Sequence, residues 1–439
     1  MSQQAGEPGI EAQDLLSGLI RFNTVNPPGN ERPAQEYLAE HLRAAGFECE
    51  LLGAEPGRPN LVARLKGAQE GPTLCYLGHT DTVLANAGEW TRDPWSGEIA
   101  DGFLWGRGAL DMKSQVAAEV AAAASLARSG WRPARGELLI VAVVDEETGG
   151  ELGAQWITQN HPEKVRCDML INEGGGAFFE YGGHRCYGVC CAEKGVFRFT
   201  IATEGVAGHA SMPGMGDNAL LKMAPVLERL AARQPGHRPT AEPLAFLEGI
   251  GEDSDHPAAS LARLAEADRR LAIMFEPMFG VTFTPTRISA SEKVNVIPSR
   301  AELKVDCRVP PGLGEAEVLE DIRDVLGTPE EGGWKLEFSE RVVGNRSPIA
   351  SELMDTISRW VEQRDPGART VPVVLPGFTD SRHFRLAFPD CVAYGFFPHR
   401  HQSMLEAAPL VHGADERIDV RDLTFATELY RDLARVILG

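Results

Sequence analysis

The feature that most constrains the fold is a run of seven apolar residues, Leu138–Val144, which leads directly into three acidic side chains. A continuous apolar run of this length predicts a β-strand buried on both faces, because a half-exposed strand alternates apolar and polar residues. Asp145, Glu146 and Glu147 follow this run, and Gly149-Gly150 come next. Neighbouring carboxylates resist joint ionisation unless a cation or a shared proton relieves them. The segment therefore predicts a central strand that ends at a charged functional site.

Helices and strands alternate along this part of the chain, which predicts an α/β sheet covered by helices on both sides. The expected helices are 10–22, 33–45, 114–128 and 152–159, and the expected strands besides 138–144 are 60–65, 73–77 and 168–171. Binding sites in such sheets lie at the C-terminal ends of the strands. We therefore expect functional side chains where these strands stop.

The pattern changes near residue 192. The strands 195–203, 280–290, 301–309 and 334–340 and the helices 218–232 and 315–326 occur in the order βαββαβ, the split ferredoxin-like unit. A long polar and helical insert, about 235–279, separates the first helix from the second strand. The α/β pattern returns after residue 346, with a helix at 351–363, strands near 371–375 and 391–397, and a helix at 423–438.

These patterns predict a discontinuous α/β domain with a mixed β-sheet between helices and an inserted βαββαβ domain. The expected bounds are 1–191 and 346–439 for the two parts of the α/β domain and 192–345 for the βαββαβ domain, insert included. A chain of 439 residues is too long for one hydrophobic core, which agrees with two domains.

The expected strand ends carry imidazoles and carboxylates in glycine-rich turns. The set comprises His79, Asp111, Glu146, Glu147, Glu173 and His412. Nitrogen and oxygen ligands without cysteine suit one or two zinc-like ions used for hydrolysis. Asp81 shares a strand face with His79 and is placed to hold its other ring nitrogen. Glu146 is the carboxylate left to take a proton from the attacking water and pass it to the leaving amine.

Each of these residues also has an ordinary structural interpretation. Asp111 precedes a helix and fits an N-cap, and His79 fits a core histidine beside a turn aspartate. Glu173 and His412 fit loop residues equally well. It is the combination of ligands, rather than any one position, that favours the metal site.

Composition narrows the function further. The net charge of −20 and the lack of a basic stripe argue against nucleic acid as a partner. The eight cysteines form no C-x-x-C pair, and we find neither a signal peptide nor an apolar stretch of about 18 residues that would span a membrane. Free thiols in a cytoplasmic enzyme are therefore expected. A serine hydrolase and a P-loop protein are excluded because G-x-S-x-G and the P-loop pattern are missing.

The order and spacing of the motifs resemble a known family over almost the whole chain. The motifs are 77–83, 106–113, 145–150, 172–174 and 411–413. They are similar to the co-catalytic zinc metallopeptidases that include glutamate carboxypeptidase, aminoacylase, acetylornithine deacetylase and succinyl-diaminopimelate desuccinylase.

This resemblance implies two zinc ions and assigns their ligands. His79, Asp111 and Glu173 would hold one ion, and Asp111, Glu147 and His412 the other. Asp81 would be the orienting carboxylate, and Glu146 the general base and acid. The peptide bond between Asp111 and Met112 is expected to be cis. Ligand type alone leaves cobalt or manganese open as the native metal.

The resemblance identifies the α/β domain as the catalytic domain and the βαββαβ domain as its lid, through which a homodimer would form. It also assigns roles to residues of this lid. His209 would reach the tetrahedral intermediate, often from the partner subunit. Asn295 and Arg308 would bind substrate, with the guanidinium on a substrate carboxylate. Taken by themselves, Arg308 fits a surface strand residue and Asn295 a turn former. Thr379 belongs to a loop near the substrate, in which Phe378 replaces a usual glycine.

The expected reaction is hydrolysis of an amide bond beside a free carboxylate in a small molecule, of the carboxypeptidase or N-acyl-amino-acid deacylase type. One alternative is a dizinc aminopeptidase or dipeptidase of the same architecture. The other is a non-catalytic binding protein on this scaffold, which would require a missing ligand or a missing Glu146. The insert at 235–279 is expected to lengthen the lid or to cover the edge of its sheet.

Overall fold

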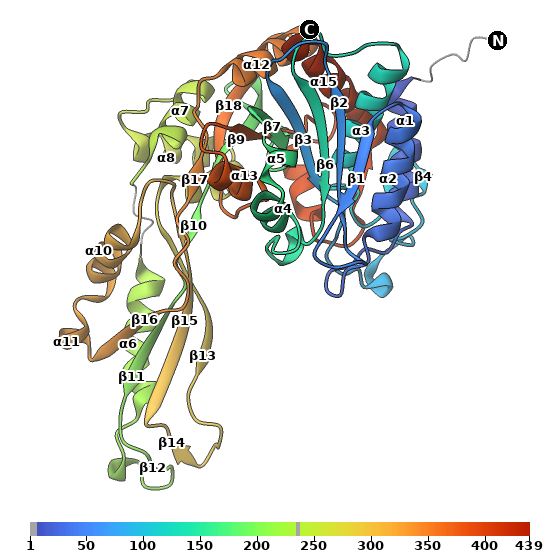
Figure 1. Cartoon of the computed structure of the whole chain (residues 1–439). Helices are drawn as coiled ribbons and strands as arrows, with labels where there is room; N and C mark the ends of the chain where they lie inside the picture. Colours follow the sequence, from blue (N-terminus) through green and yellow to red (C-terminus); the bar gives the residue numbers. More distant parts are fainter. Residues whose placement is uncertain (1–6, 234–237) are drawn as a thin grey trace.

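The computed structural model describes residues 7–233 and 238–439, which form two regions (Figure 1). We call the first the body; it contains a large twisted sheet between helices. We call the second the extension, residues 195–233 and 281–340; it is a narrow sheet with helices that projects away from the body (Figure 1). Residues 1–6, on which the signal-peptide prediction partly rests, and residues 234–237 of the insert lie outside the described residues.

The sheet of the body is mixed, as expected, and its central strands are parallel. The strand order is β1-β2-β6-β3-β7-β19-β9-β17, and β8 and β18 also pair with β9. The strands are β1 (Glu48–Leu52), β2 (Asn60–Lys66), β3 (Thr73–His79), β6 (Glu137–Val143), β7 (Met169–Asn172), β8 (Phe178–Tyr181), β9 (His184–Glu193), β17 (Asn345–Arg346), β18 (Arg369–Leu375) and β19 (Val392–Gly395). Strand β3 runs parallel to both β6 and β7, so the C-terminal ends of these three strands lie at one edge.

The apolar run that ends in three acids forms β6, which is buried on both faces. Leu138, Ile140 and Ala142 pack into the larger hydrophobic core. Leu139 and Val141 point the other way, into a second core. The prediction of a doubly covered central strand is confirmed, and the sheet around it is the α/β arrangement expected from the sequence.

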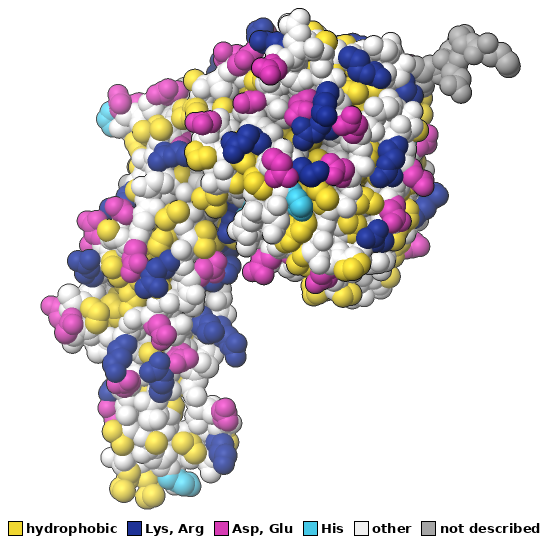
Figure 2. Space-filling model, in the orientation of Figure 1, with side chains coloured by type: hydrophobic (Ala, Val, Ile, Leu, Met, Phe, Trp, Pro, Cys, Tyr) yellow, Lys and Arg dark blue, Asp and Glu magenta, His cyan; other side chains and the backbone are white. Residues whose placement is uncertain are grey.

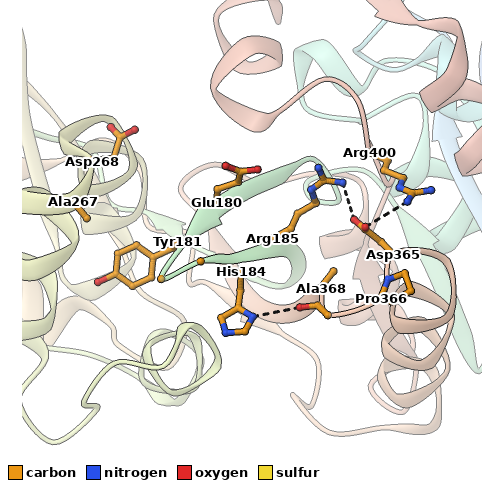
Figure 3. Close-up of a pocket in the computed structure, with 13 residues that line it drawn as sticks. Glu180, Tyr181, His184, Arg185, Ala267, Asp268, Asp365, Pro366, Ala368 and Arg400 are labelled. Atoms are coloured by element: carbon orange, nitrogen blue, oxygen red, sulfur yellow. Dashed lines mark hydrogen bonds and ion pairs between the residues drawn. The ribbon is translucent and has the colours of Figure 1, made fainter.

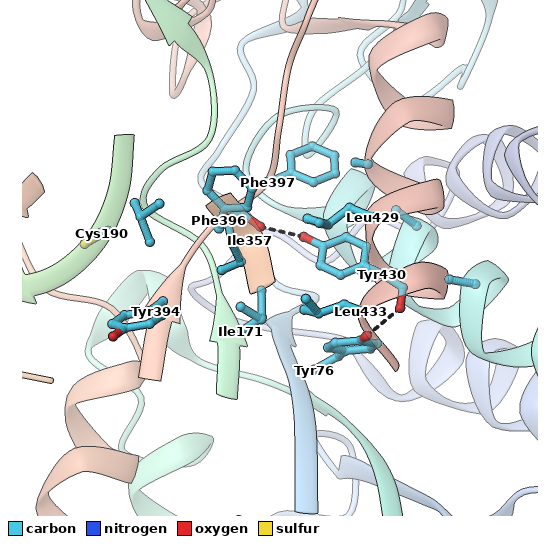
Figure 4. Close-up of a cluster of buried hydrophobic side chains, with 14 of the residues drawn as sticks. Tyr76, Ile171, Cys190, Ile357, Tyr394, Phe396, Phe397, Leu429, Tyr430 and Leu433 are labelled. Carbon is cyan, nitrogen blue, oxygen red and sulfur yellow. Dashed lines mark hydrogen bonds between the residues drawn. The ribbon is translucent and has the colours of Figure 1, made fainter. Parts of the chain in front are cut away.

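Helices cover both faces of this sheet (Figure 1). The larger core is formed with α1 (Pro8–Ile20), α2 (Arg32–Ala44), α3 (Lys113–Arg128), α12 (Glu352–Arg364) and α15 (Val420–Leu438). The other face carries α4 (Ala154–Asn160), α5 (Pro162–Val165) and α13 (Ser381–Ala387). Figure 4 shows two buried tyrosines within the larger core, and both hydroxyls donate to backbone carbonyls, Tyr76 to Tyr430 and Tyr430 to Phe396. The core thus buries these polar groups only with partners.

The rim of the body carries shorter elements. A small sheet is formed by β4 (Ile99–Ala100), β5 (Phe103–Trp105) and β20 (Arg417–Asp419), and α14 (Met404–Ala407) lies between β19 and β20 in the chain. Sheet β20-β5-β4 brings the segment before Asp111 next to the segment after His412.

The extension has the βαββαβ element order expected from the sequence. It consists of β10 (Gly195–Val196) and β11 (Phe199–Glu204), α6 (Ala219–Ala232), β13 (Thr282–Ser289), β15 (Arg300–Val309), α10 (Glu315–Leu326), α11 (Pro329–Gly332) and β16 (Trp334–Phe338). Strand β15 pairs antiparallel with β13 and β11, and β11 pairs with β16. A two-stranded ribbon, β12 (Gly208–His209) and β14 (Val296–Ile297), forms the tip farthest from the body (Figure 1).

The insert does not belong to the extension, and that expectation is wrong. Its helix α7 (Ala241–Ile250) packs against β18 of the body, and α8 (Pro257–Ala267) contacts both α7 and α9 (Arg269–Phe275). Figure 1 shows α7 and α8 beside β18. Phe246, Leu264 and Phe275 are buried in the larger core of the body. The helices carry enough apolar surface to require a large core, and the sheet edge at β18 supplies it.

Three expectations drawn from composition can be checked against the described residues. The eight cysteines are all free, as expected. No helix in the ranges 7–233 and 238–439 is both long and apolar enough to cross a membrane. Basic and acidic side chains are interspersed over body and extension on the face shown in Figure 2. A cytoplasmic location stays a prediction.

Candidate metal centre

The topology brings the predicted ligands to one edge of the body sheet. His79 is the last residue of β3, Glu146 and Glu147 lie just after β6, and Glu173 follows β7. Because β6, β3 and β7 are adjacent and parallel, their C-terminal ends meet. Asp111 reaches the same place from the loop before α3. The peptide bond between Asp111 and Met112 is cis, as predicted.

One group of side chains gathers around the ring of His79. Its Nε2 atom lies 3.1 Å from Oδ1 of Asp111, 3.8 Å from Oε1 of Glu173 and 4.0 Å from Oε2 of Glu146. The ligand atoms of His79, Glu146 and Glu173 all lie within 4.8 Å of one another. This spacing fits one ion held by an imidazole and carboxylates.

A second group forms on the other side of Asp111. Nε2 of His412 lies 3.0 Å from Oδ2 of Asp111 and 3.3 Å from Oε2 of Glu147. Asp111 therefore presents one carboxylate oxygen to each histidine. Two imidazoles joined by one carboxylate, with a further carboxylate on each side, form a donor set suited to two divalent ions.

Asp81 is fully buried, and its carboxylate fixes the turn that carries the acids. It accepts hydrogen bonds from the backbone N–H groups of Glu146 and Glu147, each at 3.2 Å, and from the amide of Asn26 at 2.9 Å. Its carboxylate lies 3.5 Å from Nδ1 of His79, whereas its backbone carbonyl lies at 3.0 Å. The ring of His79 is thus oriented mainly by the carbonyl, and the carboxylate acts more on the glutamates.

A buried ion pair that the sequence analysis missed joins the two loops of the centre. Glu416, fully buried, accepts hydrogen bonds from the backbone N–H groups of Leu110 and Asp111 and pairs with Arg107 at 2.6 Å. Arg107 also donates to the carbonyls of His412 and Gly413. The pair therefore fixes the position of His412 relative to the Asp111 loop.

Electrostatics favour a cation at this place. Burial alone would raise the pKa of Asp111, but the hydrogen bonds from His412 and His79 lower it below its usual range. The same contacts with Asp111 and Glu147 raise the pKa of His412 to about 10. Burial and the neighbouring Glu173 raise the pKa of Glu146 well above its usual range. Protons thus balance an excess of carboxylates, and bound cations would balance them equally well, so the residues fit a metal centre.

A cavity of about 470 Å³ opens beside these side chains. Its lining includes Asp111, Glu146, Glu147, Glu173 and His412. Thr379 and Phe378 also line this cavity, and a role of their loop in substrate binding stays a prediction. The hydroxyl of Thr379 donates to Glu193 at 2.7 Å and accepts from Asn172 at 3.1 Å. The threonine hydroxyl is thus already engaged within the protein.

A second cavity, of about 700 Å³, lies away from the centre (Figure 3). Its charged groups neutralise one another: the carboxylate of Asp365 lies 2.9 Å from Arg185 and 3.6 Å from Arg400 and accepts from the hydroxyl of Tyr187. The metal centre has no such balance among its own side chains, which distinguishes the two cavities.

Comparison with known proteins shows the family. Residues 75–436 match the model of the peptidase family M20/M25/M40. This chain belongs to that family. Succinyl-diaminopimelate desuccinylase 2 of Ruegeria sp. (strain TM1040) is 31% identical over 447 aligned residues, which cover 100% of this chain and 98% of the relative.

Solved structures show that the M20 fold extends over nearly the whole chain. An M20 family metallo-carboxypeptidase, Sso-CP2 from Sulfolobus solfataricus, superposes with a TM-score of 0.69 at 16% identity and covers 97% of this chain and 99% of its own. The aminopeptidase PepT from Bacillus cereus ATCC 10987 gives a TM-score of 0.67 at 15% identity, with 98% and 99% covered. The chain is accordingly a hydrolase that acts on amide C–N bonds.

Three residues expected to join the M20 site lie elsewhere in this structure. His209 is exposed in the ribbon at the tip of the extension, where its Nδ1 contacts Ser211, and the Asn295 carbonyl accepts from the nearby Ala210. Arg308 forms an ion pair with Asp306 at 2.8 Å on β15. Among the described residues, the lining of the cavity at the metal centre includes none of the three. Within one chain, the body and the extension do not form a closed site.

Proposed function

We propose that this M20 chain hydrolyses an amide bond next to a free carboxylate, as a carboxypeptidase or N-acyl-amino-acid deacylase, with water activated between two zinc ions. The observation that carries the proposal is the position of Asp111 between two histidine-bearing groups, with Glu146 beside them. In this assignment His79, Asp111 and Glu173 hold one ion, and Asp111, Glu147 and His412 hold the other.

The ions, when bound, would lower the pKa of a water molecule and polarise the substrate carbonyl. The remaining steps belong to side chains of this chain. Glu146 accepts the proton of the attacking water and then donates it to the leaving nitrogen. Its backbone N–H is fixed by Asp81, which keeps the carboxylate facing the cavity. Proton transfer at a fixed position is what a general base and acid requires.

Residues of the extension would complete the site. Arg308 would bind the substrate carboxylate with its planar fork, Asn295 would contact the substrate, and His209 would stabilise the oxyanion. Since none of them reaches the metal centre here, a rotation of the extension or a second copy of the chain has to bring them in. A homodimer through the extension, with His209 crossing between subunits, fits the tip position of that residue.

An aminopeptidase or dipeptidase is the second candidate. It is favoured by the carboxylates around the metal centre, which would attract the ammonium group of a peptide N-terminus. Under this alternative, cleavage would require a free α-amine, which an N-acyl amino acid does not have.

The test combines metal analysis with an amine-release screen. Purified protein is expected to carry close to two zinc ions per chain and to release amine from N-acyl amino acids, with activity lost on chelation and restored by zinc. Each N-acyl amino acid is compared with its C-terminal amide, in which the carboxylate is absent. A fall of at least tenfold in kcat/KM for the amide supports the carboxylate assignment. Preference for amino acid amides with a free amine supports the aminopeptidase, and full turnover in metal-free protein contradicts both.

A further inference from the structure

The lining of the cavity beside the metal centre divides into two unlike groups. One group consists of the acids of the metal centre, and the other, which we call the apolar end, consists of apolar side chains. These include Met274, Phe275 and Met278 from the insert and Phe179, Phe397 and Met404 from the body. The segment that the sequence analysis assigned to the lid therefore supplies one wall of the cavity. A volume of about 470 Å³ lies in the range of small-molecule sites, roughly 300–1,000 Å³.

The apolar wall is held in place by aromatic packing behind it. The ring of Phe275 lies 4.9 Å from that of Phe179 and 4.5 Å from that of Phe246, centroid to centroid. All three rings belong to the larger core of the body. Phe275 is thus a fixed wall, while Met274 and Met278 are flexible side chains that adapt to the shape of a ligand.

This end of the cavity offers no charge to a ligand. Among the described residues that line it there is no lysine and no arginine. His399 is its basic residue, and it is buried with neither ring nitrogen bonded to another described residue. Burial lowers the pKa of His399 to about 4, so its ring is neutral at pH 7. One neutral imidazole does not compensate the desolvation of a carboxylate.

The apolar end also lies apart from the residues expected to bind the substrate carboxylate. Within the chain as described, the lining comes entirely from the body and the insert, and no residue of the extension takes part. An N-acyl amino acid has two arms on either side of the scissile bond. If Arg308 binds the amino-acid arm from the extension, the acyl arm is the one that enters the cavity.

We propose that the cavity holds an apolar acyl chain, so that the substrates are N-acyl amino acids with aliphatic acyl groups longer than acetyl rather than succinyl derivatives. This inference rests on the proposed deacylase function and names its substrate class. It sets the chain apart from the desuccinylases to which it is similar, because a succinyl group would bring a carboxylate to the uncharged end of the cavity.

The decisive comparison uses two acyl groups of equal length. N-butyryl and N-succinyl derivatives of one amino acid differ in their terminal methyl and carboxylate groups. We expect kcat/KM to be at least tenfold higher for the butyryl compound. In a series from acetyl to octanoyl, kcat/KM is expected to rise by about fourfold per methylene group until the cavity is full. Equal or better hydrolysis of the succinyl compound overturns the inference.

A variant of the insert locates the effect in the cavity. Met274→Trp fills space at the apolar end and should lower the ratio of kcat/KM for the hexanoyl compound to kcat/KM for the acetyl compound at least tenfold. Ile273→Trp is the matched control, because Ile273 is its neighbour on α9, is 62% exposed and does not line the cavity. Equal losses for both acyl groups in Met274→Trp would contradict the assignment.

Failure of this inference is distinguishable from failure of the proposed function. Hydrolysis of acetyl, butyryl and succinyl compounds at similar rates would overturn the inference and leave the deacylase intact. If no N-acyl amino acid is cleaved, the deacylase assignment fails, and calorimetry with free butyrate and succinate on the zinc-loaded protein then decides the inference. Tighter binding of butyrate supports an apolar cavity, and tighter binding of succinate overturns it.

Discussion

The body and the extension differ in how their functional side chains are held. In the body, Asp111 and Asp81 are fixed by several hydrogen bonds, and the Arg107–Glu416 pair is buried behind them. In the extension, His209 is exposed at the tip and Arg308 is paired with a neighbour on its own strand. The functional side chains of the body are already held in position, whereas His209 and Arg308 contact only neighbours within the extension.

This difference separates two tasks. Metal binding and proton transfer need fixed geometry, and the sheet edge of the body provides it before any substrate arrives. In the proposed function, substrate recognition by the extension requires a movement of the extension or a partner subunit. Changes in the body should therefore alter metal content, stability or chemistry, whereas changes in the extension should alter substrate use and leave the metals in place.

The largest effect is expected from Glu146→Gln. The amide cannot accept the proton of the attacking water, so kcat should fall by about a thousandfold, within the range known for general acid–base catalysis. Zinc content should remain that of wild type, measured by elemental analysis of the same sample. Turnover close to wild type would remove Glu146 from the role of base.

Arg107→Met tests the buried pair behind the loops. It leaves Glu416 buried without its cation, which costs about 3–5 kcal/mol of unfolding free energy. Loosening of the Asp111 and His412 loops should weaken zinc binding by roughly 10–100-fold, measured by competition with a chelator. Arg92→Met is the control, since Arg92 pairs with Glu98 at the surface, where an ion pair contributes at most about 1 kcal/mol. Similar zinc affinities in the two variants would show that the Arg107–Glu416 pair does not hold the two loops in place.

Arg308→Met tests the extension. Loss of a charge-assisted hydrogen bond, about 1.5–3 kcal/mol, should lower kcat/KM by roughly 10–100-fold for substrates with a free carboxylate. The C-terminal amide of the same substrate should respond much less, and zinc content should not change. Arg300→Met, an exposed position on the same strand, is the matched control. Loss of zinc in Arg308→Met would show that the two regions are not independent.

The smallest effect concerns His399 and pH. Its folded pKa of about 4 lies below the ordinary value of 6.5, so between these values the unfolded chain binds more protons and stability falls as pH falls. His399→Phe removes this contribution. Between pH 7.5 and pH 5.5, the unfolding free energy should therefore fall by about 1 kcal/mol less in the variant than in wild type. Urea unfolding at the two pH values measures it. Identical losses in both proteins would show that the ring is not held neutral by burial.

The sequence predicted those parts of the site that follow from strand ends. Where an apolar run stops at acids, as at Glu146 and Glu147, the sequence shows where a buried strand ends. The contact between Arg107 and Glu416 was not predictable, because the two are far apart in the chain and the motif that contains Arg107 does not indicate its partner. It depends on the pairing of β5 with β20, a tertiary event.

The error about the insert has a similar origin. Helices rich in apolar residues, such as α7 and α9, indicate that they need a core, but their sequence does not show which of two nearby cores they join. The positions of His209 and Arg308 are a separate matter. The local ribbon and strand fix the positions of their side chains. The proposed contacts with substrate depend on a movement or a second chain, which the local sequence pattern does not encode.

The sheet of the body contains strands that precede the extension in the sequence and strands that follow it. Strands β7 and β9 precede the extension. Of the strands that follow it, β19 runs parallel to β7, and β18 runs parallel to β9. A protease nick near Val294, in the exposed loop between β13 and β14, would therefore leave two fragments joined by ladders of backbone hydrogen bonds. The first fragment would retain His79, Asp111, Glu147 and Glu173, and the second would retain His412. Such a cleaved molecule would be a non-covalent heterodimer whose metal centre lies across the junction.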